Sequence, residues 1–169
     1  SPHLCLQRVR VTAVEGMPRV TLRPRLDGDV RNLDGNYGQR FWDVVDRRQA
    51  GDPLLSMRTL PNPFGTDQYT VTASMRTSAS GLEMIDTLDH PLHVGEVFGA
   101  TLATGVQIAI TKTTAVVTTR DLPADRHLGA VERLLDDAAA MSFDEHLEAH
   151  SARWEERWAR SEVRIEGDD

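Results

Sequence analysis

The run Val106-Gln-Ile-Ala-Ile-Thr-Lys-Thr-Thr-Ala-Val-Val-Thr-Thr119 decides the fold of this chain. Within it, Val106, Ile108 and Ile110 recur at every second residue, and residues 115–117 continue as an apolar run. Alternation with a period of two places successive side chains on opposite faces of a β-strand. The run therefore predicts a strand with one face in a protein core.

Seven upstream segments have the same strand-like composition and are separated by Gly, Pro, Asn and Asp. They span residues 4–14, 19–26, 40–48, 54–60, 69–77, 82–88 and 94–103. The first two flank the turn Glu15-Gly-Met-Pro18 and are expected to form an antiparallel pair. Eight strands spaced about ten residues apart are typical of an antiparallel β-sandwich. We expect the sandwich to occupy residues 1–120.

The period changes after Asp121, and residues 121–169 are expected to form a C-terminal helical hairpin and linker. Pro123 suits a first helical turn, and a helical stripe runs to about residue 140 through Leu128, Val131, Leu135 and Ala138. A second helix begins with a capping box, Ser142 and Glu145. Its stripe needs a partner surface and consists of Phe143, Leu147, His150, Trp154 and Trp158.

Composition excludes several functional classes. The chain has 169 residues, a net charge of −7 and a pI near 5.3, whereas a nucleic-acid partner needs a basic face. No apolar run approaches the roughly 20 residues that span a bilayer. The single cysteine, Cys5, excludes an intrachain disulfide and a cysteine-based zinc site, and it favours a reducing, cytoplasmic location.

Two histidine clusters are candidate metal or acid–base sites. His90, His93 and Glu96 would share a helix face, but Pro91 and Gly95 between them favour a turn entering a strand. His146 and His150 have the spacing of a zinc pair but lack the surrounding motif and a third ligand. We interpret both clusters as structural and expect no metal site.

Trp42 is the one candidate for contact with a substrate, because an aromatic face can stack on a sugar ring. Aromatic residues make up only 5% of the chain, so a core position for Trp42 is the simpler interpretation. Adjacent carboxylates such as Asp136-Asp137 diverge on a helix and cannot converge on a scissile bond. No phosphate-binding loop or nucleophile motif is present. We therefore expect no catalytic residue in this chain.

Several stretches carry a resemblance to a known family. Residues 110–121 read Ile-Thr-Lys-Thr-Thr-Ala-Val-Val-Thr-Thr-Arg-Asp, and His150, Trp154, Trp158 and Ser161 then precede residues 165–168, Ile-Glu-Gly-Asp. Upstream, the match extends from His3 through residues 20–23 to 27–32. Together they resemble the N-terminal domain of glycoside hydrolase family 65. That family includes inverting phosphorylases of maltose, trehalose and kojibiose, and related hydrolases.

The resemblance implies an accessory sandwich related to the galactose mutarotase fold, which shapes an active site and an oligomer interface. It also implies a helical linker leading to a catalytic (α/α) six-fold barrel beyond Asp169, and a chain that begins inside the sandwich. The general-acid glutamate and the phosphate site would lie in that barrel. The implied substrate is an α-linked disaccharide, and inorganic phosphate is the implied co-substrate of a phosphorylase. The implied assembly is a homodimer without other cofactors. Apart from the resemblance, one lysine against eighteen arginines favours a bacterial source.

Two other functions remain open on the residues alone. A self-standing carbohydrate-binding module would use exposed aromatic side chains, for which Trp42, Tyr37 and Tyr69 are the candidates. A mutarotase-like epimerase would need a histidine and a carboxylate on one concave face, for which His90, His93 and Glu96 are the candidates.

Overall fold

A computed structural model describes residues 1–31, 40–161 and 167. Among these residues, nine strands precede two α-helices. The strands are β1 (Leu4–Thr12), β2 (Arg19–Leu22), β3 (Arg25–Asp27), β4 (Trp42–Arg48), β5 (Leu54–Thr59), β6 (Thr70–Ser80), β7 (Glu83–His90), β8 (His93–Thr101) and β9 (Gln107–Thr118). A 3-10 turn, η1 (Ala124–Arg126), leads into α1 (His127–Ala139), and α2 (Phe143–Ser161) follows.

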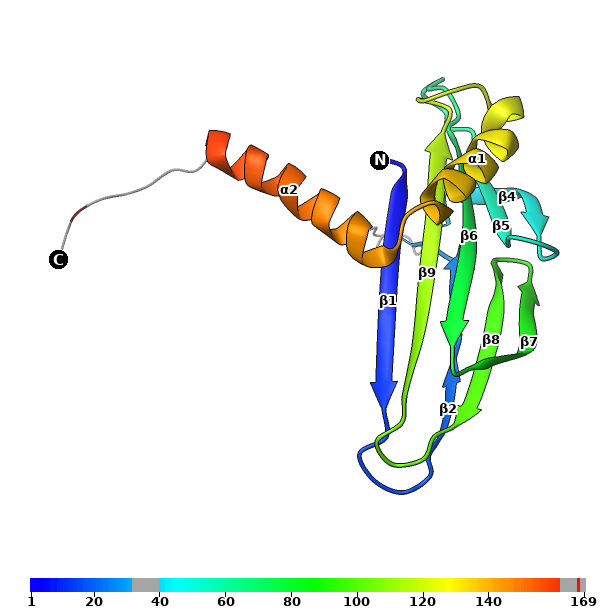
Figure 1. The fold of residues 1–169 in the computed structure, drawn as a ribbon. Coiled ribbons are helices and arrows are strands. Elements are labelled where there is room, and N and C mark those ends of the chain that lie inside the picture. The colour runs from blue at the N-terminus through cyan, green and yellow to red at the C-terminus, as the bar shows by residue number, and fades with distance from the viewer. Residues whose placement is uncertain (32–39, 162–166, 168–169) are drawn as a thin grey trace.

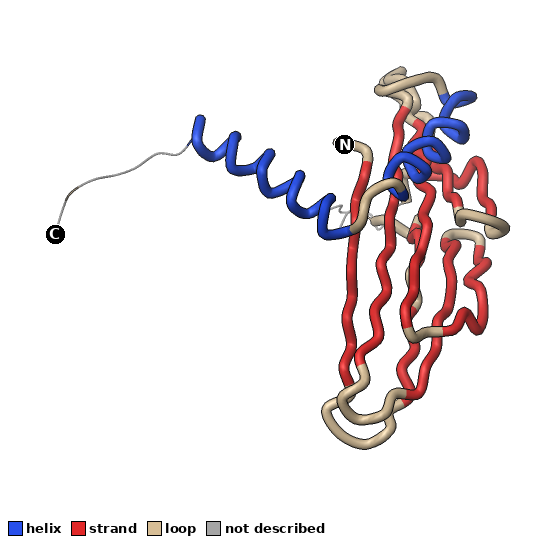
Figure 2. The backbone as a smooth tube through the Cα atoms, in the orientation of Figure 1, coloured by secondary structure: helices blue, strands red, loops and turns tan. Residues whose placement is uncertain are grey.

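The larger sheet has the strand order β1-β9-β6-β5-β4, and every pairing in it is antiparallel. Figure 1 shows β1, β9 and β6 side by side as long arrows, and the tube of Figure 2 follows the same strands. The predicted strand at residues 106–119 is confirmed as β9, which is flanked on both edges and buries Ile108 and Ile110. The alternation therefore identified a strand near the centre of the fold.

The second sheet is built around β8. Strand β7 pairs along one edge of β8, while β2 and β3 pair with successive parts of it. The expected pairing of the first two strands is wrong, because β1 pairs with β9 and β2 pairs with β8. The loop after β1 crosses between the sheets instead of turning back, and it runs beside the β8–β9 loop, where Gly105 N donates to Ala13 O at 2.8 Å.

Apolar residues fill two sides of the larger sheet. Between the sheets, one cluster consists of Leu26, Leu55, Met57, Met75 and Val94. On the opposite face, α1 packs the predicted stripe against β5 and β9, and that cluster consists of Leu54, Ala115, Val117, Val131 and Leu135. The central strands are thus covered on both faces, as expected for a sandwich with one added helical layer.

An arginine clamp adds to the attachment of α1. Arg76 on β6 donates to Asp52 at 2.6 Å and to Asp136 on α1 at 2.9 Å. The hydrogen bond to Asp52 holds the pKa of the Arg76 guanidinium above its ordinary value. The clamp therefore links a loop, the sheet and the helix through one side chain that stays charged.

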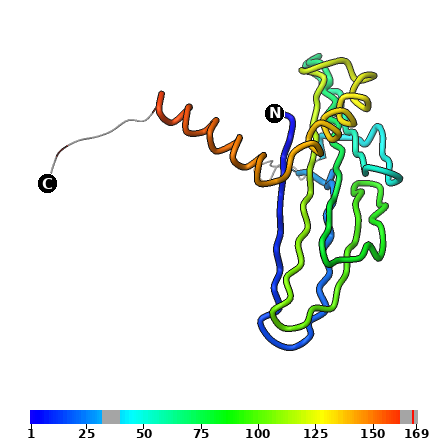
Figure 3. The backbone as a smooth tube through the Cα atoms, in the orientation of Figure 1, coloured from blue at the N-terminus to red at the C-terminus, as the bar shows by residue number. Residues whose placement is uncertain are grey.

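Helix α2 does not fold back along α1. Only residues 140–142 separate the two helices, yet α2 extends away from the sandwich toward the C-terminal end of the chain (Figures 1 and 3). The helical part is therefore two successive helices instead of a packed hairpin. Beyond its first turn, the apolar stripe of α2 packs against no surface of the described residues.

Candidate functional site

The start of α2 is fixed by the predicted capping box. The backbone N–H of Ser142 donates to Glu145 Oε2 at 2.7 Å, and Glu145 N–H donates to Ser142 Oγ at 3.3 Å. Hydrogen bonding from the backbone N–H of Ser142, and after it from the Ser142 side chain, holds the pKa of the Glu145 carboxyl below its ordinary value. The reciprocal pair satisfies two backbone donors at the helix N-terminus, so the helix begins at a defined residue.

The first turn of α2 is also tied to the sandwich. Arg8 on β1 donates through Nη1 to both carboxylate oxygens of Asp144, at 2.9 and 3.1 Å. Its guanidinium carbon lies 4.1 Å from the centre of the Phe143 ring. On the other side, the ring nitrogen Nε2 of His146 lies 2.9 Å from the carbonyl oxygen of Ala138. Because that oxygen only accepts, His146 is the donor.

Beyond this turn, α2 presents an open apolar face, which we call the tryptophan face and define as Leu147, Trp154 and Trp158. Every residue from 147 to 161 is exposed, and these three side chains are 51%, 44% and 63% exposed. The indole rings lie 6.4 Å apart, and Arg157 lies 5.5 Å from the Trp154 ring. The predicted stripe is thus confirmed as a helix face, but among the described residues only Phe143 and His146 of α2 are partly covered.

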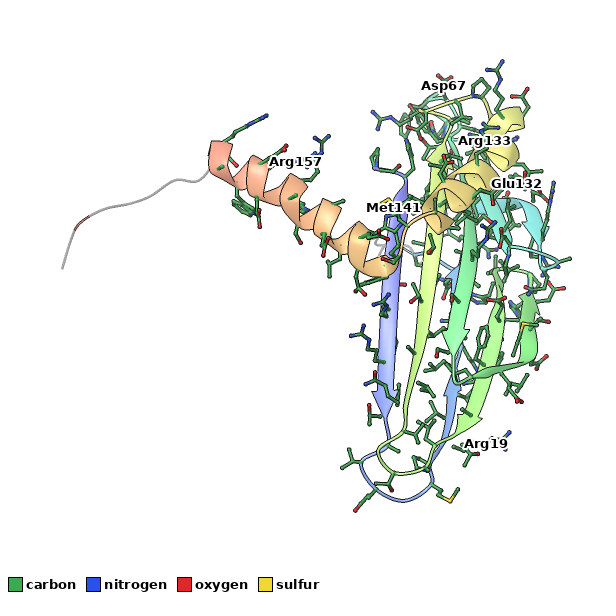
Figure 4. All side chains as sticks on the ribbon, viewed as in Figure 1. Arg19, Asp67, Glu132, Arg133, Met141 and Arg157 are labelled. Carbon is green, nitrogen blue, oxygen red and sulfur yellow. The ribbon has the colours of Figure 1, made fainter. Side chains whose placement is uncertain are left out.

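The side chains of the tryptophan face are suited to contact with another surface. Exposed indoles bring large areas to an interface and are enriched among residues that dominate binding energy. Met141, at the turn before α2, is 41% exposed as well. Figure 4 shows it at the base of α2, which we call the arm, with Arg157 further out. The tryptophan face therefore defines the candidate functional site as an interaction surface.

Trp42 lies at a different place, on the wall of an apolar cavity between the two sheets. The cavity has a volume of about 240 Å³ and is lined by Leu26, Asp27, Val30, Trp42, Leu55 and Met57 among others. The Asp27 carboxylate is already engaged by Arg25 at 3.0 Å and lies 2.9 Å from His93. Since the remaining lining is apolar, the cavity offers few partners for sugar hydroxyls, and sugar contact by Trp42 stays a prediction.

The three residues of the epimerase hypothesis are not brought together. His90 and His93 flank the turn between β7 and β8, with ring centres 5.3 Å apart. Glu96 is three residues beyond His93 on β8, and an odd spacing on a strand directs the side chains to opposite faces. The interpretation of this cluster as a turn entering a strand is confirmed.

The described residues contain no group of three or more His, Cys, Asp or Glu side chains that could hold a metal ion. His146 donates to Ala138, while His150 lies 6.1 Å from the Trp154 ring, so the two histidines serve different contacts. Among the same residues, no helix is long and apolar enough to cross a membrane.

The aromatic candidates for a carbohydrate-binding module are divided by the structure. Tyr37 lies outside the described residues, while Tyr69 is 46% exposed. The same β5–β6 loop presents Phe64, 87% exposed, which is not among the candidates predicted from the sequence. Asn62 holds the loop, since its side-chain oxygen accepts from Phe64 N–H at 2.9 Å. The signal for Phe64 was available in the Pro-Asn-Pro-Phe-Gly turn; that for Arg8 was not, because its partner is 136 residues away.

The fold and this surface define a class: an antiparallel β-sandwich domain with a helical arm, whose tryptophan face is not covered by any of the described residues. Comparison with known proteins then gives the family. The chain belongs to the glycosyl hydrolase family 65 N-terminal domain family, whose model matches residues 1–157. The expected resemblance is thereby confirmed.

Individual relatives agree with this assignment. The maltose phosphorylase of Bacillus subtilis (strain 168) is 29% identical over 168 residues, which cover 99% of this chain and 22% of that protein. The kojibiose phosphorylase of Caldanaerobacter subterraneus subsp. tengcongensis is 36% identical over 62 residues, covering 37% and 8% of the two chains. The chain thus spans about a fifth of the length of the first of these curated relatives.

A solved structure supports the fold alone. A kojibiose phosphorylase candidate from the human microbiome superimposes with a TM-score of 0.68 at 18% sequence identity, over 85% of this chain and 18% of that chain. Both relatives and the structural neighbour are thus much longer than the present chain.

Proposed function

We propose that this chain is the accessory β-sandwich domain of an α-glucoside phosphorylase or hydrolase. In this proposal, it shapes one side of the active site and contributes to an oligomer interface, while a downstream (α/α) barrel performs the chemistry. The observation that carries the proposal is the tryptophan face of α2. The surface that we expect to cover it is the barrel of the same polypeptide.

The energetics of α2 favour a partner. Most helical stability in proteins comes from the packing of an amphipathic face, and among the described residues α2 is partly covered only at Phe143 and His146. Burying the exposed parts of two indoles would release about 5 kcal/mol before the costs of association. A covered tryptophan face is therefore the more stable state of the arm.

The chemistry of the reaction is placed outside this chain. An inverting glycosidase needs a carboxylic acid that protonates the glycosidic oxygen and a nucleophile on the opposite face of the sugar. We assign neither role to a described residue, and we place the phosphate co-substrate and the α-linked disaccharide in the barrel. The relatives support this division, because they are named as phosphorylases and each is several times longer than the region that matches this chain.

The proposal is tested by assaying residues 1–169 beside the longer protein that continues the reading frame. Maltose, trehalose and kojibiose are supplied with and without inorganic phosphate, and release of glucose and glucose 1-phosphate is measured. The chain alone is expected to release neither product. Release of either product by the chain alone, above a no-protein control, would refute the division of labour.

Variants of the longer protein test the covering surface. Trp154→Ala combined with Trp158→Ala is expected to lower its midpoint of thermal unfolding and its activity together. Glu156→Ala is the matched control, because Glu156 lies on the other side of α2 and, among the described residues, forms one exposed ion pair, with Arg153 at 3.8 Å. Equal effects of the two changes would contradict the proposed contact.

A carbohydrate-binding module is the second candidate, and the exposure of Phe64 and Tyr69 in one loop is the observation that favours it. Titration of the chain with maltose, trehalose and longer α-glucans should then give heat that Phe64→Ala removes. Absence of heat with all these sugars would reject this candidate.

A further inference from the structure

We infer that Arg8 is a positioning residue that fixes the direction in which α2 leaves the sandwich. The inference concerns the arm itself, and its use in domain docking rests on the proposed function. Arg8 belongs to β1, at the edge of the larger sheet, while its partners are the first two residues of α2. One side chain thus joins the sheet to the base of the arm.

The Arg8 side chain is held from three directions. Its Nε donates to Thr111 Oγ1 on the neighbouring strand at 3.4 Å, which orients the guanidinium plane. The same group donates to both oxygens of Asp144 and stacks on the Phe143 ring. Although β1 is an edge strand, the Arg8 side chain is only 19% exposed. Because the guanidinium is planar and held in this way, it fixes the orientation of its partners at the start of α2 as well as pairing with their charge.

The other contacts at the base of α2 fix its start but leave its direction to Arg8. The capping box is internal to the helix N-terminus and joins Ser142 to Glu145. His146 ties the first turn to the end of α1 at a single point. A single point of attachment allows rotation, whereas the second tie to β1 removes that freedom.

The length of the arm amplifies the effect. Because an α-helix rises about 1.5 Å per residue, Trp158 lies about 22 Å along the axis from Phe143. A tilt of ~20° at the base would displace Trp158 by about 8 Å. Arg8 therefore determines where the tryptophan face is presented, although it lies far from both indoles.

The experiment uses two nitroxide labels and double electron–electron resonance on residues 1–169. One label is placed on the native Cys5, which is exposed on β1, and its side chain lies on the opposite face of the strand from Arg8. The second label is introduced through Ala159→Cys, at the exposed far end of α2. The distance between the labels reports the direction of the arm.

The unsubstituted arm is expected to give one narrow distance distribution, and Arg8→Gln is expected to abolish the narrow peak. Asp144→Asn should broaden the distribution in the same sense, and Asp144 is exposed enough that the fold is not at risk. The charge-swapped pair Arg8→Asp with Asp144→Arg should restore part of the peak. Arg10→Gln is the matched control, since exposed Arg10 is two residues away on the same face of β1.

A change in stability alone would not produce this pattern. The midpoint of thermal unfolding and the helical circular dichroism should be nearly equal for Arg8→Gln and Arg10→Gln, while the distance distributions differ. A broad distribution in the unsubstituted arm, or an unchanged one in Arg8→Gln and Asp144→Asn, would overturn the inference. No downstream domain takes part, so this result is independent of the activity assay that tests the proposed function.

Discussion

The imidazole of His127 and the hydroxyl of Thr72 are joined by a 2.9 Å hydrogen bond beneath α1. The second ring nitrogen, Nε2, lies 3.1 Å from the carbonyl oxygen of Leu122. Since that oxygen only accepts, Nε2 carries a hydrogen, and in the neutral imidazole Nδ1 then accepts from the Thr72 hydroxyl. The Thr72 oxygen in turn accepts from Ser56 at 2.8 Å. A buried relay of three side chains thus joins β5 and β6 to the start of α1.

Replacing Thr72 by valine should break this relay. The buried nitrogen of His127 and the hydroxyl of Ser56 would both lose their partner, so we expect the free energy of unfolding to fall by ~1–3 kcal/mol. Denaturant titration measures the loss. Thr21→Val on the exposed side of β2 is the control and should stay within about 0.5 kcal/mol of the original stability. Equal values for the two variants would show that the relay contributes nothing.

The packing of α1 on the larger sheet predicts a second loss of stability. Leu135 is 1% exposed and packs in the cluster with Leu54 and Val117. Leu135→Ala should lower the free energy of unfolding by about 2–5 kcal/mol, because it removes buried methyl groups and leaves a cavity. Leu147→Ala makes the same chemical change at a side chain that is 51% exposed. A similar loss at both positions would mean that α2 is packed in solution.

Much of this fold could be predicted from the sequence because its strands have a half-buried alternation. Strand β9 and the α1 stripe are examples, since Ile108, Ile110, Val131 and Leu135 are buried at the expected intervals. The pairing of β1 could not be predicted, because a Gly and Pro turn does not show whether the chain returns to the same sheet or crosses to the other. Pairing partners in a sandwich are set by packing far along the chain.

The buried polar contacts could not be predicted from local sequence patterns either. Thr70, Thr72 and Ser74 have the composition of an exposed face, yet α1 covers them and all three are buried. The tryptophan face itself was visible in the sequence, because two indoles share a helical period with Leu147. Its anchor at Arg8 was not, since an isolated arginine on a strand has no periodic signature.

The capping box of α2 should make the arm sensitive to acid. The hydrogen bonds from Ser142 lower the pKa of Glu145 from its ordinary value of 4.5. A depressed pKa in the folded state contributes stability above the ordinary value, and this contribution is lost as the pH falls through the folded value. Far-UV circular dichroism should therefore show loss of helix below about pH 4.5.

Glu145→Gln isolates this effect from other titrating groups. The glutamine side chain can still accept from Ser142 N–H, but it carries no titratable proton. The helical signals of the original protein and of Glu145→Gln should be similar at neutral pH. The difference between the two signals should change as the pH falls. Superimposable pH profiles would show that the Glu145 carboxylate has no role in holding α2.

Fluorescence quenching should show whether the tryptophan face is covered in a longer protein. The Trp154 and Trp158 side chains are exposed here, whereas Trp42 is half-buried on a cavity wall. In a Trp42→Phe background, the remaining emission of residues 1–169 should be readily quenched by acrylamide. The same two indoles in the longer protein should be several-fold less accessible, although its other tryptophans must first be replaced by phenylalanine. Equal quenching in both proteins would leave the face without a partner.

The edge of the second sheet predicts self-association. Strand β7 pairs only with β8 among the described residues, and its apolar Met84 and Ile85 are 59% and 50% exposed. An unpaired edge with apolar side chains recruits strands from other chains, and a lysine there opposes such pairing. Met84→Lys should therefore lower the average mass measured by light scattering at high protein concentration. Ala152→Lys adds the same charge on the exposed side of α2, away from the edge, and should leave the mass unchanged. An equal decrease in both variants would attribute the association to net charge. If the unsubstituted chain is strictly monomeric, the edge has no role in association.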